Sequence, residues 1–344
     1  MNVRKDKVRL IVADDSQLAR DIIIELLATD PAIEIVATAV NGAQAVEMAT
    51  DLRPDLITMD IEMPVMNGLE AIEAIMRKCP VPILVVTSRA DARLAYEAVS
   101  RGALEVIEKP VFGDACFANF SHKIKLLAGV RVIRHISRET PMLECTKKAS
   151  NILQAASGRK IVAIAASLGG PKILERILSR IPADFPAPIV VAQHISAGFA
   201  TDFAAWLNQK TSLDVRLASA QAKLKAGEVL IAPPEYNMRL TSHDNIELLP
   251  ALAQQRYHPS CNELLFSVAQ VYGRAAVGII LTGMGDDGVQ GLQKIKAAGG
   301  LTIAQDQQSC TVDSMPGRAI EKGAVDWILQ VDEISERIVW VMKQ

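Results

Sequence analysis

Short apolar runs recur along the first third of this chain, and each ends in a polar side chain that can bind a ligand or react. The side chains that close these runs are Asp14, Asp15, Asp60, Thr87 and Lys109. Parallel strands gather their C-terminal ends at one edge of a sheet, where ligands of open α/β sheets bind. The pattern therefore predicts a parallel sheet with three carboxylates, a hydroxyl and an ammonium group at one edge.

The stretches between these side chains have the lengths and spacings of alternating strands and helices. Strands are predicted at Val8–Ala13, Ile33–Ala39, 55–59, Ile83–Thr87 and 104–107, and helices at Gln17–Ala28 and Gly42–Leu52. Ser16 is suited to cap the first helix, because its hydroxyl can accept a hydrogen bond from a free backbone N–H. This alternation is typical of a doubly wound α/β domain.

The predicted edge has the chemistry of phosphoryl transfer. Carboxylates are good Mg²⁺ ligands, and a hydroxyl and an ammonium group can hold the oxygens of a transferred phosphoryl group. A single acidic residue at a strand end is usually a helix cap or a solvated loop residue. The full set in this order argues for an aspartate that is phosphorylated, in a domain that controls the rest of the chain.

The stretches VADDS, MDIEMPVMNG, VVTSRA and IEKP resemble those of the two-component receiver domain across residues 1–121. The resemblance implies a flavodoxin-like fold in which Asp60 accepts a phosphoryl group from a histidine kinase. It further implies that Mg²⁺ is held by Asp14, Asp15 and Asp60, and that Thr87 and Lys109 contact the phosphoryl oxygens.

One backbone feature also follows from this resemblance. The peptide bond between the lysine and the proline of the IEKP stretch is often cis in receivers. The resemblance therefore implies a cis bond at Lys109–Pro110.

Charge is distributed unevenly along the chain. Residues 1–121 carry 12 basic and 19 acidic side chains, and residues 122–160 carry nine and two, although the whole chain has a net charge of −2. We expect 122–159 to be a solvated interdomain linker, and the alternative that it docks on the acidic first domain stays open. The total charge carries no nucleic-acid signature, and the basic segment is the only place where one could lie.

The cysteines and the hydropathy pattern indicate the cellular compartment in which the protein works. The five cysteines at 79, 116, 145, 261 and 310 are scattered without a CxxC pair, which argues against a disulfide framework or a zinc site. Each is expected to be a small buried hydrophobe. No apolar run approaches the roughly 20 residues that span a bilayer, and no signal-peptide segment opens the chain. The sequence therefore predicts a soluble, cytoplasmic protein without membrane insertion.

After residue 160 the alternation of strands and helices resumes. Strands are predicted at Ile161–Ala166, 189–192 and 276–281, and helices at 172–180 and Val289–Ala297. The polar side chains that follow the three strands are Ser167, His194, Asp286 and Asp287. A hydroxyl, an imidazole and a carboxylate at one sheet edge can form a hydrolytic triad. The tight strand-to-helix turn after Ser167 would expose the serine as a nucleophile elbow does, but it lacks the G-x-S-x-G pattern. These residues alone therefore leave a structural role open.

Residues 160–344 resemble the catalytic domain of the CheB family of chemotaxis-receptor methylesterases. The matching stretches are IAASLGGP, VVAQHISAGF, VLIAPPEYNM, HPSCNELLFSVA, IILTGMGDDG and AQDQQSCTVDSMPGRAI. The resemblance implies a Rossmann-like domain that hydrolyses methyl esters of receptor glutamates and deamidates receptor glutamines, with no cofactor for the hydrolase. By motif position Ser167 is the nucleophile, His194 the base and Asp287 the third member, and the Met284 N–H helps to form the oxyanion hole.

The same resemblance implies the partners and the control of the enzyme. A chemotaxis histidine kinase is the expected phosphodonor, methyl-accepting chemoreceptors are the expected substrates, and the protein is expected to be a monomer. In the family the unphosphorylated receiver covers the catalytic edge, so phosphorylation of Asp60 is expected to activate the hydrolase.

Three departures from the family pattern keep an alternative open. Leu168 stands where the family usually has threonine, Asn237 where it has histidine, and Asn262 where it has aspartate. None removes a triad member, but a weakly catalytic regulator that acts by binding receptors or partner proteins remains an alternative. The sequence argues against a DNA-binding regulator, because residues 161–344 are slightly acidic and alternate strand with helix without a visible recognition-helix module.

Overall fold

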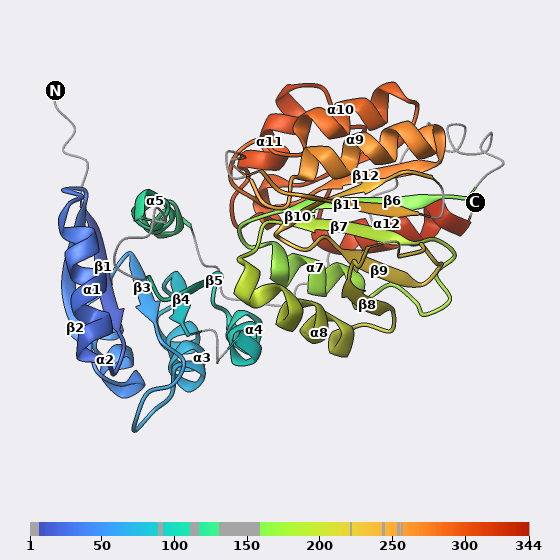
Figure 1. The fold of residues 1–344 in the computed structure, drawn as a ribbon. Coiled ribbons are helices and arrows are strands. Elements are labelled where there is room, and N and C mark those ends of the chain that lie inside the picture. The colour runs from blue at the N-terminus through green and yellow to red at the C-terminus, as the bar shows by residue number, and fades with distance from the viewer. Residues whose placement is uncertain are drawn as a thin grey trace, which may run out of the picture. The chain divides into compact units, whose positions relative to one another are not determined.

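The computed structural model describes residues 7–88, 92–110, 117–130, 159–220, 222–242, 245–252, 255 and 257–343. The chain divides into two compact units, Met1–Glu139 and Thr140–Gln344. Each unit contains a sheet of parallel strands with helices on its faces (Figure 1). The predicted fold class, two doubly wound parallel sheets, is therefore confirmed.

The first unit alternates strand and helix from its first strand to its last helix. Its strands are β1 (Val8–Ala13), β2 (Ile33–Ala39), β3 (Leu56–Met59), β4 (Ile83–Thr87) and β5 (Glu105–Glu108). Its helices are α1 (Gln17–Ala28), α2 (Gly42–Leu52), α3 (Gly68–Lys78), α4 (Ala92–Arg101) and α5 (Phe117–Ala128). The predicted cap is confirmed, because the Ser16 side chain accepts a hydrogen bond from the Ala19 amide.

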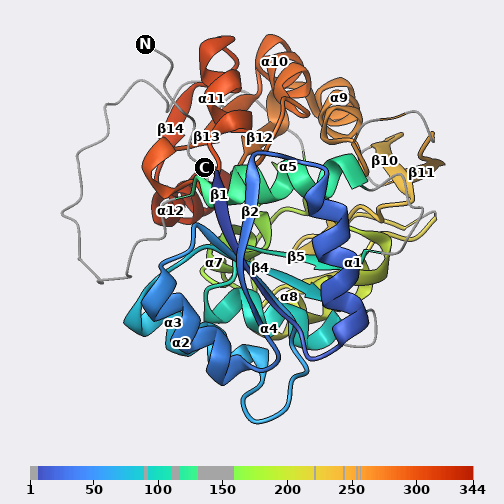
Figure 2. The ribbon, with the colours of Figure 1, turned by 90° about the vertical axis from the view of Figure 1, so that its left-hand side faces the viewer.

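The strand order β2-β1-β3-β4-β5 places the first polar site at the centre of the sheet. The chain runs outward to β2 from β1 and outward to β5 from β3, so the order reverses between β1 and β3. Ligands of open α/β sheets bind at such a switch point. Asp14 and Asp15 follow β1 and Asp60 follows β3, so all three lie there. Helices α2, α3 and α4 pack side by side in both views (Figures 1 and 2).

Helix α5 crosses the boundary that was predicted between residues 121 and 122. Phe120, Ile124 and Leu127 are all buried, which is helical spacing for one apolar face. The basic side chains that suggested a linker lie between these buried positions along α5, and they do not end the helix. The domain limits 1–121, 122–159 and 160–344 stay a prediction, and residues 131–158 of the predicted linker lie outside the described residues.

The second unit is built around a seven-stranded sheet and a separate hairpin. Its strands are β6 (Ile161–Ala166), β7 (Ile189–Gln193), β8 (Asp214–Leu217), β9 (Glu228–Ile231), β10 (Tyr236–Leu240), β11 (Ile246–Pro250), β12 (Ala276–Ile280), β13 (Leu301–Gln305) and β14 (Trp327–Leu329). Its helices are α7 (Gly170–Leu178), α8 (Ala200–Lys210), α9 (Cys261–Tyr272), α10 (Val289–Ala297), α11 (Ser314–Glu321) and α12 (Val331–Lys343). Among its described residues, short 3₁₀ turns lie at Ala197–Phe199, Gly273–Ala275 and Gln307–Ser309.

The parallel strands have the order β14-β13-β12-β6-β7-β9-β8, and β10 pairs with β11 in the antiparallel hairpin. From β6 the chain passes to β7 on one side and later to β12 on the other, so β6 lies at the switch point. Helices α9, α10 and α11 lie on one face of the sheet, and α7, α8 and α12 lie on the other (Figure 1). A core of fully buried aliphatic side chains from β6, α9 and α10 fills the first of these faces and holds the ends of β6, β7 and β12 in place.

One peptide bond and two cysteines differ from what the sequence led us to expect. The peptide bond at Lys109–Pro110 is not cis, so that expectation is wrong; within the described residues the cis bond lies at His258–Pro259. Cys261 is buried as expected, but Cys79 and Cys310 are only half-buried, and Cys116 and Cys145 lie outside the described residues.

Among the helices of the described residues, none combines the length and the apolar character that a bilayer crossing needs.

Candidate functional site

Asp14, Asp15 and Asp60 form an acidic cluster at the switch point of the five-stranded sheet. One carboxylate oxygen from each residue lies within 4.8 Å of those of the other two. Asp14 and Asp60 are buried, whereas Asp15 is exposed. Three hard oxygen donors, one of which faces solvent, fit the ligand preference of Mg²⁺.

Lys109 joins the two buried carboxylates of this cluster. Its Nζ atom lies 2.8 Å from Asp14 Oδ2 and 2.7 Å from Asp60 Oδ2. Burial raises the pKa of Asp60, and the charge of Asp14 acts in the same direction against the hydrogen bond from Lys109. Burial acts to lower the pKa of Lys109, but the hydrogen bonds to Asp14 and Asp60 outweigh it and raise that pKa. A cation thus lies where a phosphoryl group on Asp60 would bring negative charge.

The buried Thr87 ends β4 beside this cluster. Its carbonyl oxygen accepts a hydrogen bond from the Lys109 amide at 2.9 Å, which ties the end of β5 to the end of β4. The structure therefore brings all five residues predicted for the first site to one edge of one sheet.

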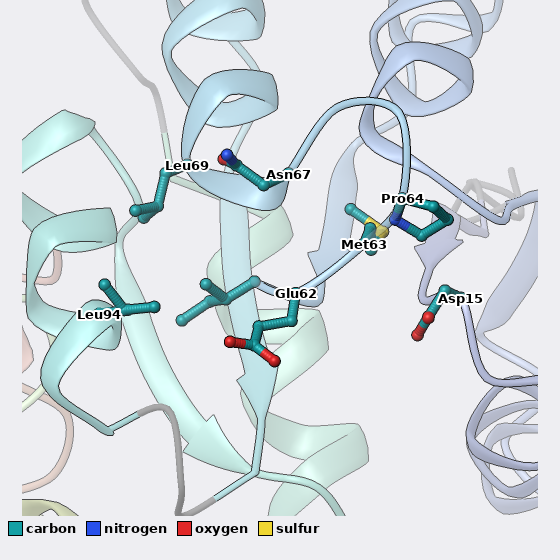
Figure 3. A pocket seen from close by; sticks show the side chains of 8 residues that line it. Asp15, Glu62, Met63, Pro64, Asn67, Leu69 and Leu94 are labelled. Atoms are coloured by element: carbon teal, nitrogen blue, oxygen red, sulfur yellow. The ribbon is translucent and has the colours of Figure 1, made fainter.

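An open pocket of about 550 Å³ adjoins the acidic cluster. Its lining residues are Asp15, Ile61, Glu62, Met63, Pro64, Asn67, Leu69 and Leu94. Figure 3 shows Asp15 on one side of the pocket and Leu69 and Leu94 on the other. Asp15 belongs to both features, so the pocket adjoins the exposed carboxylate of the cluster.

In the second unit, Ser167, His194 and Asp287 come from the ends of three neighbouring strands. Ser167 directly follows β6, His194 directly follows β7, and Asp287 closes the loop between β12 and α10. Since β12, β6 and β7 are adjacent in the sheet, their C-terminal ends meet at the switch point.

The three side chains form one hydrogen-bonded series. His194 Nδ1 lies 3.0 Å from Ser167 Oγ, and His194 Nε2 lies 2.9 Å from Asp287 Oδ2. In the tautomer that carries its proton on Nε2, the imidazole donates to the carboxylate and accepts from the hydroxyl. Ser167 and Asp287 are buried, and the His194 side chain is 14% exposed. This cluster is consistent with a hydrolytic triad.

The chain after Ser167 turns sharply from strand into helix. Gly169, the residue before the first turn of α7, has a φ of 76°, a left-handed conformation that glycine adopts without strain. A Cβ atom on Gly169 would also lie 2.4 Å from the Thr311 hydroxyl oxygen. The Ser167 amide donates to the Thr282 carbonyl at 3.1 Å. The turn and this bond hold the hydroxyl at the top of the sheet.

Gln193 ties the nucleophile loop to the base loop. This fully buried residue donates from Nε2 to the Ser167 carbonyl at 2.8 Å and to the His194 carbonyl at 2.9 Å. The His194 amide donates in turn to the Ala166 carbonyl at 3.1 Å. The bonds to the Ser167 and Ala166 carbonyls join two backbone segments that are more than 25 residues apart in the chain.

Asp287 accepts hydrogen bonds from the start of helix α9 as well as from His194. The Cys261 amide donates to Oδ2 at 2.6 Å, and the Asn262 amide and the Ser260 hydroxyl donate to Oδ1 at 2.9 and 3.3 Å. Burial acts to raise the pKa of Asp287, but His194 and the two amides outweigh it and lower that pKa. The carboxylate is therefore held ionised at the positive end of a helix.

Asp286, the other aspartate of the GDDG stretch, points elsewhere. It is 57% exposed and pairs with Arg318 at 3.3 Å. The structure therefore brings Asp287, and not Asp286, to His194.

The two asparagines that depart from the family pattern both hold the loop around Asp287. Asn237 Oδ1 accepts from the Ser260 amide at 2.9 Å, and Asn262 Oδ1 accepts from the Gly291 amide at 2.8 Å. Leu168 is buried, and its carbonyl accepts from the Thr282 hydroxyl at 3.0 Å. These three residues are accommodated in the fold without displacing a member of the triad.

Met284 lies in the loop that follows β12 and is half-buried. Its neighbours Gly283 and Gly285 both donate their amides to other groups, at 2.9 and 3.2 Å. Within the part of the chain that is described, the Met284 amide has no hydrogen-bond acceptor. A free backbone donor near the nucleophile is what an oxyanion site requires.

Reasoning from the sequence missed the roles of Gln193, Ser260 and Cys261. Cys261 Sγ lies 3.5 Å from His194 Nε2, although the cysteine spacings gave no sign of it. Burial, followed by the charge of Asp287, raises the pKa of Cys261 well above its usual range, so it stays a thiol. A local signal existed for Ser260, since Ser-x-x-Glu before an apolar run is typical of a helix start.

The fold and the two sites together define a response regulator with an enzymatic output domain. A response regulator receiver domain is matched at residues 10–118, and the CheB methylesterase family is matched at residues 162–338. The chain therefore belongs to the CheB methylesterase family, with a receiver domain in front of the methylesterase domain.

Individual relatives match over nearly the whole chain. A protein-glutamate methylesterase/protein-glutamine glutaminase of Paramagnetospirillum magneticum is 43% identical over 97% of this chain and 96% of its own length. One of Anaeromyxobacter dehalogenans is 42% identical over 95% of each chain. Among solved structures, the CheB methylesterase catalytic domain of Thermotoga maritima is 35% identical with a TM-score of 0.52, covering 54% of this chain and 99% of that chain.

Proposed function

We propose that this chain is a protein-glutamate methylesterase and protein-glutamine glutaminase of chemotaxis adaptation, switched by phosphorylation of Asp60. The observation that carries the proposal is the hydrogen-bonded series from Ser167 through His194 to Asp287. The names of the relatives, which cover nearly the full chain, support the same activity.

In the first half of the reaction, Ser167 Oγ bonds to the carbonyl carbon of a receptor glutamate methyl ester. The Ser167 proton passes to His194 Nδ1, which lies 3.0 Å from the hydroxyl oxygen. Asp287 stabilises the imidazolium that forms, and the Met284 amide donates to the negative carbonyl oxygen. His194 then returns the proton to the leaving oxygen, and methanol departs from an acyl-enzyme.

In the second half, water attacks the acyl-enzyme and gives its proton to His194. The Ser167 oxygen leaves with a proton from His194, and a glutamate side chain is released. A glutamine substrate follows the same two steps with ammonia as the first leaving group. One triad therefore serves both reactions, because each is an acyl transfer to water.

The receiver supplies the control in this proposal. Asp60 accepts a phosphoryl group from a chemotaxis histidine kinase, and Lys109 and Thr87 contact its oxygens. Asp14, Asp15 and Asp60 would hold a Mg²⁺ ion, which would neutralise the charge of the phosphoryl oxygens. The receptors of the chemotaxis system are the substrates, and the protein works as a cytoplasmic monomer.

Methanol release from receptor-bearing membranes with radiolabelled methyl esters tests the catalytic proposal. Ser167→Ala is expected to lower the rate by about 10⁴-fold or more, since the nucleophile and the base act as a unit. Ser179→Ala, which alters an exposed serine at the end of α7, is the matched control and is expected to keep the full rate. Equal rates in wild type and Ser167→Ala would favour a regulator that acts by binding.

A small-molecule phosphodonor with Mg²⁺ tests the control. It is expected to raise ester hydrolysis by wild type by about 5- to 150-fold, which corresponds to a coupling of roughly 1–3 kcal/mol. Asp60→Asn is expected to abolish the increase, and the exposed Asp51→Asn is expected to keep it. An unchanged rate in protein that is demonstrably phosphorylated on Asp60 would rule out the switch.

A further inference from the structure

Tyr257 lies in the loop between β11 and α9 and stacks on the base of the triad. The ring centroids of Tyr257 and His194 are 5.1 Å apart, and the ring planes differ by only 10°. Nearly parallel rings at this separation form an offset stack, one of the favoured aromatic arrangements. The contact covers a face of the imidazole that neither Ser167 nor Asp287 touches.

The loop after β12 holds Tyr257 in this position. Its hydroxyl donates a long hydrogen bond of 3.4 Å to Asp286 Oδ1, and Asp286 is paired with Arg318. A Cβ atom on Gly285 would lie 2.3 Å from the Tyr257 hydroxyl oxygen, so only glycine leaves room for the ring here. The tyrosine is thus supported at its hydroxyl end as well as along its face.

The bond at Cγ and the two hydrogen bonds set the mean plane of the His194 imidazole, and rotation about Cβ–Cγ is the motion that would disturb it. Ser167 binds Nδ1 and Asp287 binds Nε2, so the two bonds define a line through the ring. Rotation about the Cβ–Cγ bond would tilt the ring and turn the lone pair of Nδ1 away from the hydroxyl. A parallel aromatic ring opposes that rotation, because turning the imidazole would break the stack. The electron-rich face of a tyrosine also attracts the imidazolium that forms during catalysis.

We propose that Tyr257 is a positioning residue for His194, which fixes the plane of the imidazole for proton transfer from Ser167. This inference rests on the proposed hydrolase function and adds a residue to it. The ring of Tyr257 makes the larger contribution to kcat, and its hydroxyl makes a smaller one.

The test compares kcat and KM for methyl ester hydrolysis in wild type, Tyr257→Phe and Tyr257→Leu. Tyr257→Leu is expected to lower kcat by about 10- to 100-fold, the scale of a small misplacement of a reacting group, with little change in KM. Tyr257→Phe keeps the ring and is expected to stay within about threefold of wild type, since only the long hydrogen bond is lost. Tyr236→Leu removes a half-exposed tyrosine of β10 as a matched control and is expected to keep both constants.

Two further measures distinguish a loss of folding from a loss of catalysis. Each variant is assayed well below its thermal midpoint, and Tyr257→Met serves as a second ringless variant, because methionine fills irregular space well. An unchanged kcat in folded Tyr257→Leu or Tyr257→Met would overturn the inference, as would an equal loss in Tyr257→Phe. A wild-type protein without ester hydrolysis would instead overturn the proposed function itself, so the two failures are distinguishable.

Discussion

At the scale of single residues, Asp287 has two roles that depend on the same four donors. It orients His194, and it accepts hydrogen bonds from the Cys261 and Asn262 amides and the Ser260 hydroxyl. The same carboxylate therefore serves the proposed chemistry and caps the start of helix α9.

Asp287→Asn is expected to lose both roles. The amide nitrogen of asparagine would face backbone donors, so kcat should fall by about 10⁴-fold, and the free energy of unfolding should fall by about 1–3 kcal/mol. The folded-state pKa of Asp287 is lowered, so its stabilisation is present above the unfolded pKa and lost as pH falls through the folded value. Urea unfolding at neutral pH and well below pH 3.8 should show the wild-type advantage only at the higher pH.

The exposed neighbour Asp286 provides the control for this experiment. Asp286→Asn is expected to change the free energy of unfolding by no more than about 0.5 kcal/mol at either pH. An advantage of wild type over Asp287→Asn that grows at low pH would contradict the argument.

The sequence predicted the members of both sites because each follows an apolar run. The positions of Ser167 and His194 follow from strand ends alone, since parallel strands gather their ends. The contacts of Tyr257 and Cys261 with His194 could not be predicted in this way. Both residues lie in or beside an irregular loop, and their distance from His194 depends on how α9 packs on the sheet.

At the scale of elements, helix α5 shows the limit of charge as a guide to structure. Its basic side chains suggested a linker from residue 122, yet Ile124 and Leu127 are fully buried. Charge marks the outer face of a helix as readily as it marks a solvated segment.

Leu127→Ala in the full chain tests whether α5 belongs to the fold of the first unit. The change is expected to lower the stability of that unit by about 2–5 kcal/mol, the usual range for a buried leucine. His122→Ala, on the exposed side of the same helix, is the control and should leave stability within about 0.5 kcal/mol. If Leu127→Ala behaved like the control, residues 122–130 would act as a linker.

In the second unit the adjacent strands β12, β6 and β7 were predicted, whereas β9, β13 and the edge strands β8 and β14 were not. Strand β6 is buried on both faces and forms one apolar run, whereas β8 and β14 are short and partly exposed. Edge strands contact fewer neighbours, so their sequences need no continuous apolar run. The hairpin of β10 and β11 was missed for a similar reason, because polar residues interrupt both strands.

At the scale of the whole molecule, the chain contains two parallel sheets that each have a core of their own. Compact units with separate cores are expected to unfold in separate steps. The acidic cluster belongs to one unit and the triad to the other, so ligands of one site should stabilise one step only.

Calorimetry with and without Mg²⁺ tests this expectation. Mg²⁺ should raise the midpoint of one transition, because an ion that binds only the folded state stabilises it. Asp15→Asn should remove this increase with little effect on metal-free stability, since Asp15 is the exposed ligand. Asp51→Asn changes an exposed residue of α2 and should leave the Mg²⁺-dependent increase in place. A shift of both transitions would show that the units unfold together.

The double role of Asp287 has an evolutionary consequence. A descendant that abandoned hydrolysis could exchange Ser167 or His194 for other residues at moderate cost to its fold. Losing Asp287 would also leave the amides at the start of α9 without their acceptor. We therefore expect the aspartate to be the last member of the triad to disappear from lineages that have become inactive, so its presence alone is a poor sign of a working enzyme.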